Sequence, residues 1–429
     1  MFDQLSTRRL FLKKGMTLIA AGATIPTFLD QTVLAVANPE DVSSTQRASG
    51  KDGKILVVVQ FSGGNDGLST VVPYADDTYH RLRPVIAHKA ETVHKINDYI
   101  GLNPNLGAVA DLLQKGKAAI IQGVGYPNPN RSHFRSMDIW QSARPDHETE
   151  SSGWLGRFFD NQCSGSDPKS VDPKIGISIG QQLPLAMTGE HVRPIAFERT
   201  DAFRYNGPDR ARYEQLNKSA EASFVDSSSH KLTSASRLDF LHRTAMDAQV
   251  SSDRVLQIMR DYQSTATYPG GEFGQGLRAI AAMIHGGLPT RVYYVSLGGF
   301  DTHAGERTRH DVLMKQFADG MQAFWNDMEH HGNDQRVLLM TFSEFGRRVA
   351  ENASHGTDHG TAAPMFLFGS SVQSGVIGKH PSLTNLDQGD LRYTTDFRSV
   401  YASVLENWLD AKSEPVLGKR FELAPILRA

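Results

Sequence analysis

Short runs of apolar, β-prone residues alternate with polar segments through the second half of the chain. Two such runs begin after Arg291 and after Arg336, and each ends in small residues that are followed at once by ionisable ones. Between them, residues 310–331 carry apolar side chains at intervals of three and four, which predicts an amphipathic helix. A strand, a helix and a strand in this order predict a β-α-β unit with parallel, buried strands.

The same patterns predict the other elements. Strands are expected at residues 54–61, 118–123, 175–179, 194–197 and 365–368, and helices at residues 102–115, 154–159, 274–285 and 396–409. The sequence therefore predicts an α/β fold with a mostly parallel central sheet. Residues 151–270 are less regular, and we expect an insertion or cap there. His310, His330 and His331 are expected to face solvent.

Composition narrows the class of protein. Hydrophobic residues at 39% and aromatic residues at 9% are typical of a globular core, and a net charge of −2 argues against a nucleic-acid partner. The single cysteine, Cys163, excludes an intrachain disulfide and a zinc site built from cysteines. Any metal would be held by His, Asp and Glu.

The amino terminus predicts export. Arg8-Arg9 precedes a moderately apolar segment, and Ala35-Val36-Ala37 has the small residues of a cleavage site. Residues 1–37 are therefore interpreted as a twin-arginine signal peptide, residues 38–53 as a flexible leader and residues 54–429 as the folded domain. The expected partner is the twin-arginine translocation machinery, and the expected location is the periplasm or the exterior. No transmembrane segment is expected in the mature chain.

Acidic and histidine residues recur where the strands of the sheet should end. Parallel sheets bind ligands at the carboxyl ends of their strands. Carboxylates and imidazoles without thiolates favour zinc or manganese, with calcium or magnesium as alternatives, and two ions about 4 Å apart could clamp an ester. The sequence therefore predicts one or two divalent ions, with these ligands: Asp66, Asp301, His303, Glu344 and His359. Asp66 also suits a glycine-rich turn.

A predicted helix begins at His133, next to Ser132 and two arginines. A helix N-terminus attracts anions. Ser132 could cap this helix or act as a nucleophile, and the sequence leaves both roles open.

Several motifs together resemble the bacterial family of unknown function 1501, which is grouped with the alkaline phosphatase and sulfatase superfamily. They are the twin-arginine leader, F-S-G-G-N-D-G-L-S-T, N-R-S-H-F, G-G-F-D-T-H, F-S-E-F-G-R and T-D-H-G-T-A, and the resemblance runs from about residue 54 to the end. It implies an alkaline-phosphatase-like three-layer sandwich with a dinuclear metal site. Carried over by motif order, it implies these roles: Asp66 as an early ligand, Ser132 as the nucleophile, Asp301 with His303 as the next group, Glu344 in place of an Asp-His pair, and His359 as the late histidine.

Two departures from the superfamily pattern affect the expected site. The spacing of Asp301 and His303 is D-x-H, where phosphatases of the superfamily have D-x-x-x-H. Ser343-Glu344 stands where an Asp-His pair is expected, which removes an imidazole from one metal site.

The expected function is an exported metal-dependent hydrolase that acts on an anionic phosphate or sulfate ester. Arg131 and Arg347 would neutralise the substrate oxygens. Asn65 and Asp358 would support the metal ligands, Asp358 by orienting His359 or else as a turn residue. The alternative is a non-catalytic exported protein on the same fold that binds a cell-envelope or polymer partner. The sequence does not distinguish phosphate from sulfate.

Overall fold

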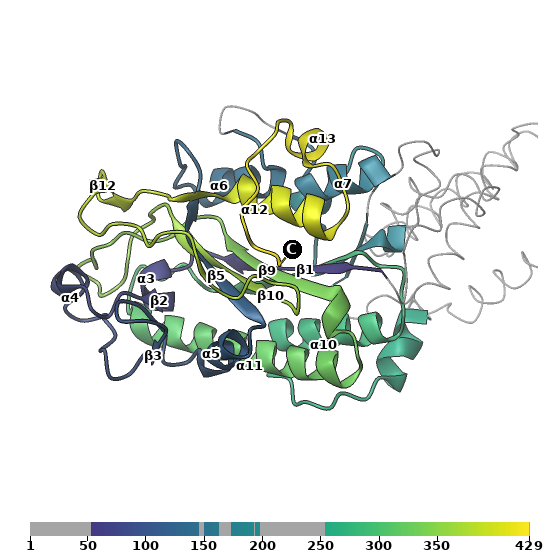
Figure 1. The fold of residues 1–429 in the computed structure, drawn as a ribbon, viewed down its shortest axis with the longest axis horizontal. Coiled ribbons are helices and arrows are strands. Elements are labelled where there is room, and N and C mark those ends of the chain that lie inside the picture. The colour runs from purple at the N-terminus through teal and green to yellow at the C-terminus, as the bar shows by residue number, and fades with distance from the viewer. Residues whose placement is uncertain (1–52, 146–149, 163–172, 193, 198–253, 429) are drawn as a thin grey trace, which may run out of the picture.

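The computed structural model describes residues 53–145, 150–162, 173–192, 194–197 and 254–428 (Figure 1). The expected signal peptide, most of the leader and Cys163 lie outside these residues. No helix among the described residues is long and apolar enough to cross a bilayer.

A nine-stranded sheet forms the centre of the described part of the chain. Its order is β11-β5-β10-β9-β1-β8-β6-β7, with β14 also paired to β5. The strands are β1 (Ile55–Ser62), β5 (Ala118–Gly125), β6 (Gly176–Ile179), β7 (Ile195–Phe197), β8 (Val292–Gly298), β9 (Val337–Ser343), β10 (Ala363–Phe368), β11 (Gly375–Ile377) and β14 (Thr395–Asp396). All neighbouring pairs are parallel except those of β10, which runs antiparallel to β5 and β9.

Strand β1 lies at the middle of this sheet because its residues are apolar almost throughout. Seven of its eight residues are buried, as expected for a strand covered on both faces. It pairs in parallel with β8 on one side and β9 on the other. Helix α11 (Glu306–His330) connects β8 to β9, which allows both to run in the same direction.

Helices cover both faces of the sheet (Figure 1). Helices α6, α7, α12 and α13 lie on one face, and α5, α10 and α11 lie on the other. The helices are α3 (Gly67–Thr70), α4 (Asp77–Leu82), α5 (Gly107–Gln114), α6 (His133–Ser142), α7 (Trp154–Gln162), α10 (Glu272–His285), α11, α12 (Phe397–Ser403) and α13 (Ser413–Leu417). The predicted three-layer α/β sandwich is therefore confirmed.

Shorter elements complete the described fold. Two small sheets pair β2 (Val71–Val72), β4 (Gly101–Leu102) and β3 (His94–Lys95), and β12 (Leu386–Asp387) with β13 (Asp390–Leu391). A π-helical turn spans Val404–Trp408, and 3-10 turns span Pro173–Ile175, Leu185–Met187 and Asp334–Arg336. Residues 254–261 are helical.

Three sequence predictions were wrong in detail. Leu102 does not start a helix, because it belongs to β4 and pairs with Val71. Strands β6 and β7, which were expected in a cap, extend the main sheet from β8. His310 does not face solvent, because it lies on the face of α11 that packs against the loop after β1 and is fully buried.

Candidate metal centre

The candidate site lies where the strands β1, β8 and β9 end and helix α6 begins. Asp301 and His303 follow β8, Glu344 directly follows β9, and His359 lies in the loop that leads to β10. His133 is the first residue of α6. We call Asp301, His303, His359 and His133 the metal cluster.

Three donor atoms of this cluster form a nearly equilateral triangle. The Nε2 atoms of His303 and His359 lie 2.9 Å apart, and they lie 3.1 and 3.2 Å from Asp301 Oδ1. Ligand atoms about 2.0–2.1 Å from a tetrahedral ion are themselves roughly 3.3 Å apart. Asp301 and His303 are about half exposed, so the triangle opens to solvent.

His133 approaches the same carboxylate from the other side. Its Nε2 atom lies 3.5 Å from Asp301 Oδ2, and its ring packs against Phe345 and the ring of His359. His133, Asp301 and His359 each offer a ligand atom, and these atoms lie within 4.8 Å of one another. From the sequence, His133 was expected only to begin a helix, although it lies in the N-R-S-H-F motif.

Glu344 holds His133 in place. Glu344 Oε1 lies 3.0 Å from His133 Nδ1 and also accepts a hydrogen bond of 2.8 Å from the Gly63 amide. The carboxylate is buried and receives a further bond of 3.2 Å from the Ser343 hydroxyl. A carboxylate on the far nitrogen of a histidine fixes its tautomer and its orientation toward a metal. Glu344 was expected to be a metal ligand. In the structure it instead orients His133, which could be a ligand.

Gly63 brings the loop after β1 against the site. Its φ angle is +120°, and a Cβ atom there would lie 2.4 Å from the Asp301 backbone nitrogen. Only glycine allows both the backbone angle and this close approach. The glycine-rich loop therefore supplies an amide to Glu344 and packs against the chain at Asp301.

Two further contacts orient the remaining histidines. His359 Nδ1 lies 2.9 Å from the Arg131 carbonyl oxygen, to which it must donate, so its Nε2 lone pair faces Asp301 and His303. Burial lowers the pKa of His359, which favours the neutral ring that a ligand needs. Asp358 Oδ1 lies 3.4 Å from His303 Nδ1, and a hydrogen bond from Asn352 lowers the pKa of Asp358. Asp358 was expected beside His359, but it orients His303 instead.

The two arginines expected to face substrate have other partners. Arg347 is buried, and its guanidinium donates at 2.7 Å to Asp301 Oδ1. It also donates to the backbone carbonyl oxygens of four residues, Gly63, Gly64, Phe300 and Thr357. Burial opposes ionisation of Asp301, but the hydrogen bond and the positive charge of Arg347 outweigh it and hold the pKa of Asp301 at about 2. The Arg131 guanidinium forms an ion pair with Asp390.

Ser132 is exposed at the N-cap position of α6, next to His133. Its side chain makes no capping hydrogen bond, and its amide donates at 2.9 Å to Asn130 Oδ1. Capping the helix was one of the two roles that the sequence left open for Ser132, and the structure does not support that role.

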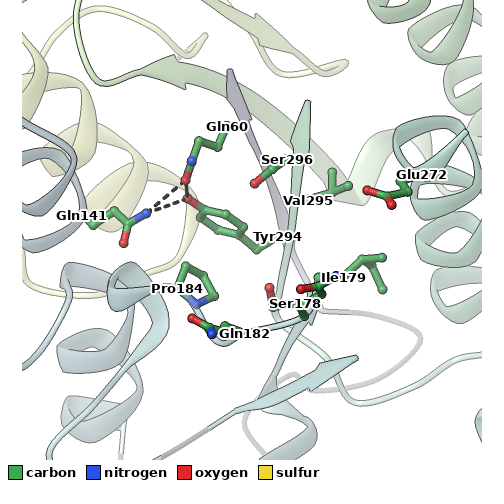
Figure 2. A pocket seen from close by; sticks show the side chains of 12 residues that line it. Gln60, Gln141, Ser178, Ile179, Gln182, Pro184, Glu272, Tyr294, Val295 and Ser296 are labelled. Carbon is green, nitrogen blue, oxygen red and sulfur yellow. Dashed lines mark hydrogen bonds between the residues drawn. The ribbon is translucent and has the colours of Figure 1, made fainter. Parts of the chain in front are cut away.

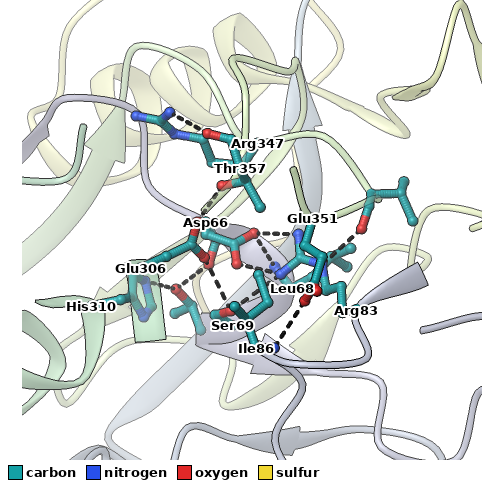
Figure 3. Close-up of polar contacts among 12 residues, drawn as sticks. Asp66, Leu68, Ser69, Arg83, Ile86, Glu306, His310, Arg347, Glu351 and Thr357 are labelled. Carbon is teal, nitrogen blue, oxygen red and sulfur yellow. Dashed lines mark hydrogen bonds and ion pairs between the residues drawn. The ribbon is translucent and has the colours of Figure 1, made fainter. Parts of the chain in front are cut away.

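Asp66 pairs with a buried guanidinium and not with a residue of the metal cluster (Figure 3). It caps α3, and its carboxylate forms a fully buried ion pair with Arg83, whose Nη2 atom donates at 2.9 Å to Asp66 Oδ1. A carboxylate whose two oxygens are both bound by a buried guanidinium is not available to an ion. Asp66 was expected to be a metal ligand, but in the structure its carboxylate is bound by Arg83 instead.

A second carboxyl group, Glu306, lies beside this ion pair (Figure 3). Burial and the neighbouring Asp66 charge raise the pKa of Glu306 to about 9, because one guanidinium neutralises only one of the two carboxylates. Asn65 belongs to the same group, since its Oδ1 atom lies 3.0 Å from His310 Nε2. Asn65 was expected to support the metal ligands, but its side chain serves this buried group.

The residues of the metal cluster fit a single divalent ion. Three of its donor atoms already converge, and the hydrogen bond that occupies His359 Nδ1 leaves its other nitrogen free to bind. With Asp66 held by Arg83, the cluster lacks the early carboxylate that the expected second ion required.

Solved structures match the chain at low similarity. A protein in the alkaline phosphatase superfamily from Vibrio parahaemolyticus is 8% identical, with a TM-score of 0.31 over 84% of this chain and 71% of that chain. The zinc complex of the C-terminal periplasmic domain of EcEptC from Escherichia coli is 8% identical, with a TM-score of 0.32 over 76% and 77%. The lipoteichoic acid synthase LtaP from Listeria monocytogenes is 11% identical, with a TM-score of 0.32 over 82% and 73%.

No curated protein matches the chain by sequence. A family model does: the one described as "Protein of unknown function (DUF1501)" matches residues 53–407, which is most of the chain. The chain therefore belongs to the DUF1501 family.

Proposed function

We propose that this protein is an exported, metal-dependent hydrolase of phosphate or sulfate esters. The observation that carries the proposal is the convergence of two histidine nitrogens and one carboxylate oxygen within 3.2 Å of one another at the open end of the sheet. Export rests on the signal-peptide pattern of residues 1–37.

Asp301 and His359 would hold the ion, together with His303 and His133. Imidazole-rich donor sets suit zinc or manganese better than calcium or magnesium, which prefer oxygen ligands. When bound, the ion would supply positive charge to an anionic ester and polarise its oxygens. We therefore propose zinc or manganese, and one ion per chain.

The protein's own groups prepare this site in two ways. Arg347 keeps Asp301 ionised, and Glu344 keeps His133 directed at the cluster. The N-terminus of α6 adds the positive end of a ten-residue helix, which favours an anion beside Ser132.

We propose Ser132 as the nucleophile. Its hydroxyl is exposed and free of a capping bond, and it lies one residue from His133. Its hydroxyl would lose a proton to water, and its oxygen would bond to phosphorus or sulfur as the bond to the ester oxygen breaks. The leaving oxygen would take up a proton, and water would then cleave the covalent intermediate and restore the hydroxyl.

One observation favours a second candidate, a non-catalytic binding protein with a single structural metal. The ion pair of Asp66 with Arg83 removes a carboxylate that a two-ion hydrolase would use. A binding protein would take up metal but would not turn over esters.

The deciding experiment measures metal content and turnover together. Purified mature protein is assayed with p-nitrophenyl phosphate and p-nitrophenyl sulfate, beside His359→Ala, Ser132→Ala and the control His330→Ala on the exposed end of α11. We expect turnover in wild type and control, and a loss of roughly a thousandfold in the other two variants, because several kcal/mol of transition-state stabilisation disappear. Metal binding without turnover of either ester in wild type would favour the binding protein. Full activity in Ser132→Ala would remove Ser132 as the nucleophile.

A further inference from the structure

A polar cavity lies toward the carboxyl ends of β1, β6 and β8 (Figure 2). Its volume is about 310 Å³, which is at the lower end of the range for small-ligand pockets. Its polar lining includes Gln60, Gln141, Ser178, Gln182, Tyr294 and Ser296. We call it the amide pocket.

The inner wall of the amide pocket is a built hydrogen-bond network (Figure 2). Gln60 Oε1 accepts from Gln141 Nε2 at 3.0 Å and from the Tyr294 hydroxyl. Gln141 is itself fixed, because its Oε1 atom accepts at 3.2 Å from the Ala186 amide. These three side chains are more than nine-tenths buried, so the network is rigid and water is largely excluded from it.

Several polar groups of the pocket have no partner among the described residues. The Gln60 Oε1 atom accepts two hydrogen bonds, but the Gln60 Nε2 atom makes none within the described part of the chain. Ser178 as a residue is 2% exposed, and its hydroxyl likewise makes no hydrogen bond to described residues. Gln182 and Ser296, at the rim, are exposed and likewise make no side-chain hydrogen bond to described residues. Polar groups that face a cavity without protein partners can bind a ligand that supplies donors and acceptors.

The charge of the lining indicates which ligand. Of the described residues that line the pocket, Glu272 alone carries a formal charge, and none is Lys or Arg. An anionic group would therefore meet no cation here. Amides and hydroxyls offer donors and acceptors side by side, which matches the hydroxyl groups of a sugar ring.

The amide pocket and the metal cluster share their supporting elements. Helix α6 begins at His133 in the cluster and reaches the pocket at Gln141, a span of about 12 Å along the helix. Strand β8 lines the pocket at Ser296 and leads directly to Asp301. A second cavity of about 320 Å³ shares Glu272 and Ser296, so the hollow continues along the sheet edge. One extended ligand could therefore occupy both sites.

We propose that the amide pocket binds an uncharged sugar ring of an oligosaccharide substrate whose ester group lies at the metal cluster. The inference rests on the proposed function, because it assigns the ester to that cluster. The network of Gln60, Gln141 and Tyr294 would select hydroxylated rings over aryl or alkyl groups.

The test is direct binding to an array of neutral oligosaccharides, with the folded mature protein as the probe. Gln182→Leu and Ser296→Leu change exposed side chains, so both variants should fold, which thermal unfolding checks. The matched control is Gln114→Leu, an exposed glutamine on α5 across the sheet. We expect wild type and control to bind a subset of the glycans equally. Each pocket variant should bind about three- to tenfold more weakly, the loss expected from one hydrogen bond.

Turnover of p-nitrophenyl esters, measured in parallel on wild type, separates this inference from the proposed function. Ester turnover without glycan binding would overturn the sugar assignment and leave the proposed hydrolase intact. Capture of peptides from a parallel peptide array, instead of glycans, would do the same. Equal glycan binding by wild type and both pocket variants would also overturn it. Glycan binding that the pocket variants weaken, without ester turnover, would support a sugar site in the pocket and overturn the hydrolase.

Discussion

The Nε2 atoms of His303 and His359 lie 2.9 Å apart, although the two residues are 56 positions apart in the chain. His359 must use its Nδ1 proton to bond the Arg131 carbonyl, so its Nε2 atom presents a lone pair to His303. A divalent ion between the two rings and Asp301 would satisfy all three groups at once.

Removing one cluster ligand should abolish metal binding. We expect His359→Ala and Asp301→Ala to contain no stoichiometric metal, whereas wild type carries one ion per chain, measured by mass spectrometry of the metal. His330→Ala, the same chemical change at an exposed position, should keep the wild-type content. Chelation should also lower the melting temperature of wild type but not of His359→Ala, because a ligand stabilises only the state that binds it. Wild type without metal after loading would contradict the proposed centre.

Glu344→Gln should weaken metal binding without unfolding the protein. The amide can still accept from the Gly63 backbone, but it is uncharged and holds His133 less strongly. Residues that orient a metal ligand typically contribute 10- to 100-fold to affinity, so we expect a loss of about that size. A competition titration with a chromogenic chelator measures it. Complete loss of the ion would instead indicate that Glu344 is itself a ligand.

Substitutions at the buried ion pair should affect stability and leave metal binding intact. Arg83→Met leaves the Asp66 carboxylate buried without its partner, and Asp66→Asn does the same to Arg83. Each should lower the free energy of unfolding by about 3–5 kcal/mol, as measured by urea denaturation. The folded fraction of Asp66→Asn should still bind one ion. Loss of the metal from well-folded Asp66→Asn would restore Asp66 as a ligand.

Glu306 should make stability depend on pH. Because its pKa is raised by burial and by Asp66 to about 9, the folded chain keeps a proton that the unfolded chain releases near pH 4.5. This contribution to stability is fully present below about pH 4.5 and is lost as the pH rises to about 9. Glu306→Gln, neutral at every pH, should show a smaller decline in the free energy of unfolding between pH 5.5 and pH 9.

The matched control for this titration is Glu414→Gln, an exposed glutamate on α13. It should reproduce the wild-type pH dependence, because it removes an exposed carboxyl group that is not part of the buried group around Asp66 and Arg83. Parallel curves for wild type and Glu306→Gln would show that Glu306 is ionised in the folded protein.

Local sequence patterns were sufficient for most of the described elements. The buried strand β1, the helix α11 and the position of Asp301 and His303 after β8 follow from apolar runs and their periodicity, which act within one element. Strand ends are also a local feature, so the sequence by itself located the edge of the sheet at which polar groups gather.

The tertiary structure decided which of those polar groups meet. Asp66 and Asp301 both follow buried strands. Arg83, from a neighbouring loop, binds the Asp66 carboxylate, whereas the Asp301 carboxylate lies beside histidines. His133 joined the cluster only because α6 packs with its first residue against Glu344. Periodicity records which face of an element is apolar, but partners brought together from distant parts of the chain leave no local pattern. The sequence therefore determined the architecture and the edge of the sheet at which the candidate site lies, and long-range packing determined which side chains gather there.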